Sequence, residues 1–386
     1  MTPILDSKLP HVGTTIFTVM SALALEHKAV NLGQGFPDFA CAPELVQHVT
    51  NAMLEGLNQY PSMLGVQELR VAVSKKIEAL YHKTYDANSE ITITAGATQA
   101  ILSAILATVR AGDEVIVLEP CYDSYIPNIE LSGGVVVPVP MKPGSFKVDF
   151  EAIQQAISPQ TRAIIINSPH NPSATLWSAE DYQRLGQMLK DTSIFVISDE
   201  VYEHMVFAPN HHISAASFPL LAERAFIISS FGKTYHVTGW KVAYCAAPAA
   251  LTVEFRKVHQ FNVFTVNTPV QHALARYMQD PSPYLQLPAF YQRKRDLFRA
   301  GLAQTHFSLL PAQGSYFQCV RLDDLKVPER TLGESKFCEW LTSEIGVAAI
   351  PLSAFYRDGF DQGIVRFCFA KKDETLQLAL ERLAKL

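Results

Sequence analysis

The sequence predicts an α/β fold, with a large domain built on a mostly parallel central sheet and a smaller α+β domain. Between residues 91 and 248, short β-branched runs alternate with segments of helical periodicity. The strand candidates are apolar throughout, which is typical of a parallel sheet covered by helices on both faces. With 386 residues, the chain is long enough to bury a large core.

The strand candidates of the large domain follow one another through the middle of the chain. Helical patterns such as residues 98–110 and 179–190 separate several of them. The six strand candidates are residues 91–94, 115–118, 135–139, 163–166, 194–197 and 225–228. We assign residues 46–283 to this large domain.

The last third of the chain has a mixed pattern, which favours a small α+β domain at residues 284–386. Pro281 and Pro283 interrupt its helical patterns. The expected elements are helices at about 249–280, 284–304, 334–345 and 373–385 and strands at 316–320 and 364–369. We expect residues 1–45 to form an arm with one short helix that packs with the small domain.

Composition and charge exclude several classes of protein. The net charge of −5 and the pI near 6.2 give no reason to expect a nucleic-acid or anionic-membrane partner. The six cysteines are scattered without a Cys-x-x-Cys pair, and we find no carboxylate or cysteine at ligand spacing for His170, His204, His211 and His212, so we expect free thiols and no metal. The apolar stretch at 16–25 is too short to span a bilayer and lacks signal-peptide flanks. We therefore expect a cytoplasmic protein.

A different chemical group follows each of five strand candidates. Taken singly, each has an ordinary structural explanation: a helix start, a half-buried aromatic ring, a turn, or a capping or paired carboxylate. Ligands bind at the carboxyl ends of the strands in open α/β sheets, so the five positions should meet at one edge. The groups are Gly96-Ala97-Thr98, Tyr122, Asn171, Asp199 with Tyr202, and Ser230 with Lys233.

Together these groups match the needs of pyridoxal 5′-phosphate. The backbone N–H groups of Ala97 and Thr98 would hold its phosphate at a helix start, and Gly96 would let the backbone approach closely. Tyr122 would stack on the pyridine ring. Asp199 would pair with the ring nitrogen and keep the ring an electron sink.

The remaining groups complete the expected cofactor site. Asn171 and Tyr202 would form hydrogen bonds to the ring hydroxyl. Lys233 follows an apolar run and lies among small residues, which suits a Schiff-base lysine better than a solvated charge. Ser230 and Lys241 would add a donor and a positive charge at the phosphate.

Seven motifs then give the chain a family resemblance that extends from about Gly13 to the C-terminus. The chain resembles the class I/II aminotransferases of the pyridoxal-phosphate fold-type I superfamily. It is most similar to the branch with kynurenine aminotransferase, glutamine transaminase K and bacterial methionine aminotransferase. The motifs are Asn-Leu-Gly-Gln-Gly-Phe-Pro-Asp at 31–38, Ala-Gly-Ala-Thr at 95–98, Asn-Ser-Pro-His-Asn-Pro at 167–172, Ser-Asp-Glu-Val-Tyr at 198–202, Ser-Ser-Phe-Gly-Lys at 229–233, Thr-Gly-Trp-Lys at 238–241 and Ile-Val-Arg-Phe-Cys-Phe at 364–369.

The resemblance implies roles for further residues. Arg366 would grip the substrate α-carboxylate through a two-pronged contact, assisted by Asn171 and by the backbone near Gly35. Tyr60 would reach the phosphate of the neighbouring subunit, which implies a homodimer with shared active sites. One departure is visible, because many relatives have a glycine where this chain has Ala174.

The expected reaction is a ping-pong transfer of an α-amino group to a 2-oxo acid. Phe17, with Ile16, Met20, Tyr60 and Phe264, offers an apolar and aromatic pocket that favours methionine, glutamine or aromatic amino acids over aspartate. The alternative for residues 16–20 is one buried helix face. The alternative functions are a cysteine-conjugate C–S β-lyase and a ligand-sensing module of a transcription regulator. The negative charge and the lack of a basic helix-turn-helix segment disfavour the second.

Overall fold

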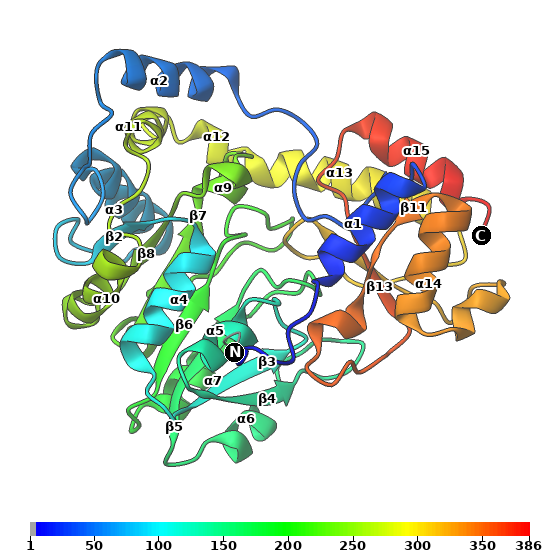
Figure 1. Cartoon of the computed structure of the whole chain (residues 1–386), viewed down its shortest axis with the longest axis horizontal. Helices are drawn as coiled ribbons and strands as arrows, with labels where there is room; N and C mark the ends of the chain where they lie inside the picture. Colours follow the sequence, from blue (N-terminus) through cyan, green and yellow to red (C-terminus); the bar gives the residue numbers. More distant parts are fainter. Residues whose placement is uncertain (1–4) are drawn as a thin grey trace, which may run out of the picture.

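The central sheet of the computed structural model, which describes residues 5–386, has seven strands (Figure 1). Their order across the sheet is β2-β8-β7-β6-β5-β3-β4. Strand β8 runs in the opposite direction to the other six strands. The strands are β2 (Ile91–Thr94), β3 (Glu114–Glu119), β4 (Val135–Pro140), β5 (Thr161–Asn167), β6 (Phe195–Asp199), β7 (Ala225–Ser230) and β8 (Ala243–Ala246). The predicted α/β class and all six predicted strands are confirmed.

Strand β8 was not predicted from the sequence. Its four residues, Ala-Tyr-Cys-Ala, are short, and alanine is not enriched in strands. Tertiary pairing overrides this weak local preference, because β8 is inserted between β2 and β7 and bonds to both.

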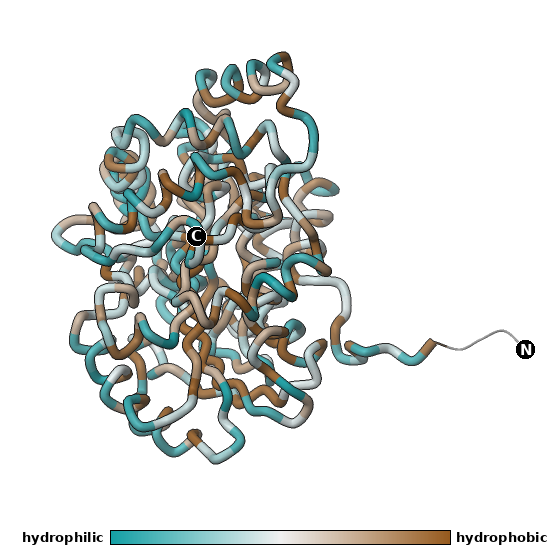
Figure 2. The backbone as a smooth tube through the Cα atoms, turned by 90° about the vertical axis from the view of Figure 1, so that its left-hand side faces the viewer, coloured by the Kyte–Doolittle hydropathy of each residue, from teal (hydrophilic) through white to brown (hydrophobic). Residues whose placement is uncertain are grey.

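Helices cover both faces of the sheet because the inner strands are apolar on both sides. On one face, α4 (Ala97–Thr108), α5 (Tyr125–Leu131) and α10 (Ala249–Asn262) bury side chains such as Ile105 and Phe255 against the sheet. On the other face, α3 (Gln67–Tyr81), α6 (Phe150–Ala156), α7 (Ala179–Leu189) and α8 (Pro219–Ala222) pack into the larger core. Figure 2 shows the hydrophobic stretches gathered inside the body of the molecule.

The single long helix expected near 249–280 is wrong. The chain instead forms α10 and then α11 (Thr268–Tyr277), with an irregular segment between them. Asn267 starts α11 because its side chain accepts a hydrogen bond from the backbone N–H of Val270, and Pro269 occupies the first turn. Helix α11 packs against α2 (Pro43–Leu54), which stands at one end of the molecule (Figure 1).

The C-terminal part contains a second, antiparallel sheet of order β12-β13-β10-β9. Helix α13 (Leu287–Leu302) packs against α15 (Asp373–Leu383), and α14 (Glu334–Trp340) packs on the sheet. The strands are β9 (Ser308–Leu309), β10 (Phe317–Arg321), β12 (Ile350–Pro351) and β13 (Ile364–Cys368).

The N-terminal segment lies against this C-terminal part. Helix α1 (Ile16–Glu26) contacts α14, and β1 (Val30–Asn31) pairs in parallel with β11 (Val347–Ala348). Short helices at Ser282–Leu285 (α12) and Phe231–Thr234 (α9) complete the α-helical elements of residues 5–386. Within those residues, no helix has the length and apolar character needed to cross a membrane.

Candidate active site

A cavity at the carboxyl edge of the central sheet brings together ten of the predicted site residues. They come from the start of α4, the segments after β3 and β5, the end of β6, the turn after β7 and the segment before β8. The ten are Gly96, Ala97, Thr98, Tyr122, Asn171, Asp199, Tyr202, Ser230, Lys233 and Lys241. The parallel strands end at one edge, so groups far apart in sequence converge there.

The N-terminus of α4 opens directly into the cavity. Helix geometry leaves the N–H groups of Ala97 and Thr98 without intrahelical partners, so they can bind an anion. Gly96 precedes them with φ +84° and ψ 164°, a conformation open essentially to glycine alone. A Cβ on Gly96 would lie 3.1 Å from both Cε and Nζ of Lys241, so glycine also lets this lysine approach.

Asp199 ends β6 as a buried carboxylate, 4% exposed, at the floor of the cavity. The Tyr125 hydroxyl donates to its Oδ2 at 2.6 Å, and the backbone N–H of Val201 donates to Oδ1 at 3.3 Å. Burial raises the pKa of Asp199 to about 6, although both hydrogen bonds and Lys233 act in the opposite direction. The sequence did not predict Tyr125, which stands three residues after Tyr122 on the short helix α5.

Lys233 follows β7 in α9, and its half-buried amine is held by two acceptors. Nζ donates to the Tyr316 hydroxyl at 2.9 Å and to the Gly35 carbonyl at 3.3 Å. Burial lowers the pKa of Lys233 to about 8, against the opposing influence of Cys368 and Asp199. Tyr316 immediately precedes β10 of the second sheet, 83 residues from Lys233 in sequence. The sequence did not predict its contact with Lys233.

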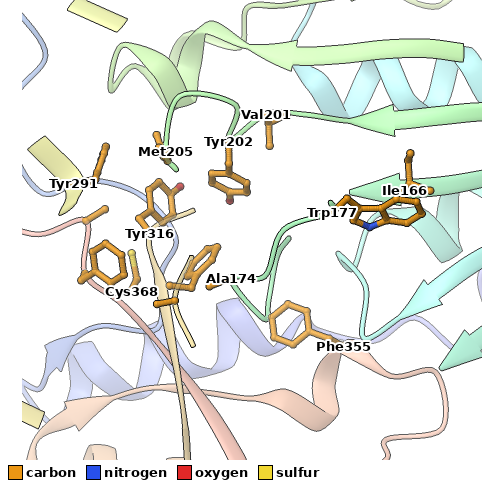
Figure 3. Close-up of a cluster of buried hydrophobic side chains, with 14 of the residues drawn as sticks. Ile166, Ala174, Trp177, Val201, Tyr202, Met205, Tyr291, Tyr316, Phe355 and Cys368 are labelled. Atoms are coloured by element: carbon orange, nitrogen blue, oxygen red, sulfur yellow. The ribbon is translucent and has the colours of Figure 1, made fainter. Parts of the chain in front are cut away.

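Two of the predicted tyrosines, Tyr122 and Tyr202, line the cavity. Tyr122 packs edge-on against Tyr125, with ring centroids 5.7 Å apart. Tyr202 is buried and packs edge-on against Tyr316 at 5.1 Å. Figure 3 shows the rings of Tyr202, Tyr316 and Tyr291 grouped together beside the segment that carries Met205.

Arg366 on β13 is buried at 1% exposure beside Asn171. Its Nη1 donates to Asn171 Oδ1 at 2.6 Å and its Nη2 to the Gly33 carbonyl at 3.1 Å. The guanidinium lies 3.9 Å from the ring centroid of Phe317 and 5.4 Å from that of Phe17. Among residues 5–386 its buried Nε–H has no partner, so a donor remains for a further acceptor.

Four predicted residues lie outside the cavity lining: Arg366, described above, and Gly35, Phe17 and Tyr60. Gly35 lies near the cavity because its carbonyl contacts Lys233, and Phe17 lies near it because its ring faces Arg366. Tyr60 is 81% exposed and packs edge-on against Phe264, with ring centroids 5.3 Å apart. Within this one chain, the structure does not bring Tyr60 to the cofactor residues.

The departure at Ala174 has a local structural consequence. Ala174 adopts φ +61°, the left-handed conformation that glycine takes most easily, and is completely buried. Its backbone N–H donates to the His170 carbonyl at 2.9 Å, so the turn closes with alanine in place of glycine.

The donor set fits pyridoxal 5′-phosphate. A helix N-terminus with Lys241 beside it suits a phosphate, a buried carboxylate suits a protonated ring nitrogen, and a lysine of lowered pKa suits a carbonyl carbon. Within the described residues, no group of three His, Cys, Asp or Glu side chains could hold a metal ion.

This fold and this site define a pyridoxal 5′-phosphate enzyme of fold type I. The chain belongs to the class I and II aminotransferases, whose family model matches residues 27–383. Aminotransferase activity and dependence on pyridoxal 5′-phosphate follow from this membership, and the β-lyase alternative is not favoured.

Individual relatives match over nearly the whole chain. A methionine aminotransferase of Escherichia coli is 51% identical over 99% of this chain and 98% of its own length. A solved E. coli structure that identifies a methionine aminotransferase function superposes with a TM-score of 0.97, at 51% identity and 100% coverage of both chains. The N-succinyldiaminopimelate aminotransferase structure from Mycobacterium tuberculosis has a TM-score of 0.93 at 38% identity, covering 99% of this chain and 100% of that one. Human kynurenine–oxoglutarate transaminase 3 is 34% identical over 97% of this chain and 88% of its own length.

Proposed function

We propose that this aminotransferase takes the α-amino group from methionine, glutamine or an aromatic amino acid and passes it to a 2-oxo acid in two half-reactions. The observation that carries the proposal is the convergence of Lys233, Asp199, Asn171 and the α4 N-terminus on one cavity, with Arg366 beside it. The similarity to methionine and kynurenine aminotransferases supports this range of amino donors.

Each of the ten predicted cavity residues has a binding task in this proposal. The N–H groups of Ala97 and Thr98, with Ser230 and Lys241, hold the phosphate. Gly96, which has no side chain, lets the backbone and Lys241 approach the phosphate closely. These groups line the cavity and combine a helix N-terminus with a cation, and both features favour the binding of a phosphate.

The remaining cavity residues hold the pyridine ring. Tyr122 would stack on the ring, Asn171 and Tyr202 would donate hydrogen bonds to the ring hydroxyl, and Asp199 would pair with the ring nitrogen; all four residues line the cavity. Tyr125 fixes the Asp199 carboxylate for this contact through its hydrogen bond to Oδ2.

The chemistry that bound pyridoxal 5′-phosphate supplies is electron withdrawal from the substrate Cα. Lys233 would hold the cofactor covalently in the resting enzyme. Once freed, its Nζ would accept the Cα proton of the substrate and later donate it back. Its lowered pKa favours this role because a larger fraction of the amine is neutral near physiological pH.

Arg366 determines where the substrate binds. Phe317 and Phe355 flank its guanidinium, with centroids at 3.9 and 4.9 Å, and keep water away from it. A substrate carboxylate would pair with the remaining donors, beside the Asn171 amide and the backbone near Gly35. The apolar neighbours Phe17 and Phe355, 5.9 Å apart edge-on, suit a methionine or aromatic side chain better than an acidic one.

The active enzyme in this proposal is a cytoplasmic homodimer. Exposed hydrophobic side chains gather around α2 and the end of α10, where a second copy would cover them. They are Met53, Leu54, Tyr60, Phe261 and Phe264. Tyr60 would then reach the partner's phosphate and side-chain pocket.

We also propose that the chain divides into an N-terminal arm (1–45), a large domain (46–283) and a small domain (284–386).

Replacing Lys233 by alanine tests the proposal. We expect Lys233→Ala to bind the cofactor non-covalently and to lose turnover with every amino acid. Lys75→Ala, which removes an exposed lysine on α3, is the control and should remain fully active. Normal turnover in Lys233→Ala would rule the proposal out. In wild type, 2-oxo acid formation from a panel of amino acids should rank methionine, glutamine and aromatic donors above aspartate.

A further inference from the structure

The amine of Lys233 is held by a hydrogen-bonded pair, the Tyr316 hydroxyl and the Gly35 carbonyl. Tyr316 is completely buried and lies 83 residues from Lys233 in sequence. Its hydroxyl contacts both Lys233 Nζ, at 2.9 Å, and the Gly35 carbonyl oxygen. Gly35 O itself accepts from Lys233 Nζ at 3.3 Å. Three segments from the N-terminal, middle and C-terminal parts of the chain therefore meet at one nitrogen.

The chemistry of these groups fixes the direction of each hydrogen bond. The Gly35 carbonyl can only accept, so the Tyr316 hydroxyl donates its proton to it. The Tyr316 oxygen then has only lone pairs to offer, and Lys233 must be the donor toward it. A neutral amine has two N–H bonds and one lone pair. Tyr316 and Gly35 take both N–H bonds, so the lone pair remains free.

The free lone pair faces the cavity. Lys233 lines the cavity, whereas neither Tyr316 nor Gly35 is among its lining residues, so the two acceptors hold the amine from behind. Two N–H bonds directed backwards leave the lone pair directed forwards. The Tyr316 ring is itself immobilised by Tyr202 at 5.1 Å and Phe317 at 4.9 Å, between ring centroids, so the hydroxyl position is rigid.

We infer that Tyr316 is a positioning residue for proton transfer, whose hydroxyl orients the free amine of Lys233 toward the substrate Cα–H bond. In that step the Cα–H bond breaks, a new N–H bond forms at Nζ, and the electron pair of the broken bond stays with the substrate. The resulting ammonium directs its third N–H into the cavity, where it can return the proton. This inference rests on the role proposed for Lys233 and adds Tyr316 as the residue that orients its amine.

The charges around the amine are compatible with this task. Burial lowers the pKa of Lys233 to about 8, so part of the amine is neutral near physiological pH. Two neighbours favour the neutral form and two favour the ammonium. The first pair is Arg366 and Lys241, and the second is Cys368 and Asp199. The Tyr202 ring also faces the amine, with its centroid 5.4 Å from Nζ.

Tyr316→Phe removes the hydroxyl and keeps the ring. Tyr291→Phe is the matched control, because Tyr291 is a buried neighbour, 5.8 Å away between ring centroids, whose hydroxyl has no partner among the described residues. In single-turnover experiments with methionine, we expect Tyr316→Phe to slow the half-reaction about 10- to 100-fold. The dissociation constant of methionine should not change. The isotope effect with α-deuterated methionine should rise, because proton transfer becomes slower than the other steps. Tyr291→Phe should match wild type in all three.

A second readout uses the protein without cofactor. The pH dependence of Lys233 labelling by an amine-reactive reagent, followed by peptide mass spectrometry, reports the pKa of Lys233. An ammonium makes a stronger hydrogen bond to Tyr316 than a neutral amine does, so Tyr316→Phe should lower this pKa by about half a unit to one unit. Unchanged rate, isotope effect and pKa in Tyr316→Phe would overturn the inference.

A further measurement on wild type covers the case in which Tyr316→Phe does not fold. In crystals of the enzyme loaded with pyridoxamine 5′-phosphate, Lys233 is free, and Nζ should lie within hydrogen-bond distance of Tyr316 Oη. An amine directed elsewhere would contradict the inference. Turnover in Lys233→Ala would instead remove the proposed function itself. If Lys233→Ala is inactive and Tyr316→Phe behaves as wild type, only the role of Tyr316 fails.

Discussion

Replacing Arg366 by alanine should mainly weaken the binding of substrate. Arg366 is buried, its guanidinium lies against Phe317, and only the Asn171 side chain and the Gly33 carbonyl accept hydrogen bonds from it within residues 5–386. A substrate carboxylate in Arg366→Ala would be buried without its cation. Truncating one partner of such a pair typically costs about 2–5 kcal/mol. At about 1.4 kcal/mol per factor of ten, methionine affinity should fall about 30- to 4,000-fold.

The assay is the dissociation constant of methionine, measured by titrating the cofactor absorbance in wild type and in Arg366→Ala. Methionine amide, which lacks the carboxylate, serves as the internal control and should lose much less affinity than methionine. Arg366→Lys should recover only part of the loss, because an ammonium cannot make the two-pronged contact. Equal losses for methionine and its amide would refute the assignment, since the arginine would then act through packing alone.

Three further outcomes are expected. In protein freed of cofactor, the rate of recombination with pyridoxal 5′-phosphate should rise as pH increases through about 8, because the neutral amine of Lys233 reacts; a rise only near the pKa of an ordinary lysine would contradict the lowered pKa. Glu203→Gln should lower the free energy of unfolding by about 3–5 kcal/mol in denaturant titrations, because it leaves Lys76 buried without its counter-charge. Glu203→Gln combined with Lys76→Met should cost less than the sum of the single changes. Gly96→Ala should lower the free energy of unfolding by about 1–3 kcal/mol, because alanine is strained at φ +84°. Cofactor affinity in Gly96→Ala should fall as Lys241 is displaced, and an unchanged dissociation constant would show that the lysine does not need this approach.

The central sheet could be predicted because its strands are continuous apolar runs. Residues 163–166, for example, all lie inside β5, and the polar groups that follow such runs reach a common edge by the geometry of a parallel sheet. This is why Asp199 and Lys233 could be placed together from the sequence. Strand β8 could not, because it is only four residues long, two of them alanine, and its position depends on pairing with β2 and β7.

The residues that the sequence did not predict are those that act across long sequence separations without a motif of their own. Tyr125 reaches Asp199 from a position 74 residues away in the chain, and Tyr316 reaches Lys233 from the position just before β10, an inner strand of the second sheet. An isolated tyrosine is most often a core aromatic, as Tyr291 is here. Only the three-dimensional packing of the N- and C-terminal parts against the central sheet distinguishes Tyr316 from Tyr291.

The aminotransferase half-reaction with methionine, in the absence of any 2-oxo acid, tests the account most directly. Purified enzyme with bound cofactor should release about one equivalent of the 2-oxo acid of methionine per active site, while its absorption band shifts. Addition of a 2-oxo acid should restore the band, and Lys233→Ala should show neither change. Continued release without an acceptor, or release of pyruvate from cysteine conjugates with no response to methionine, would contradict it.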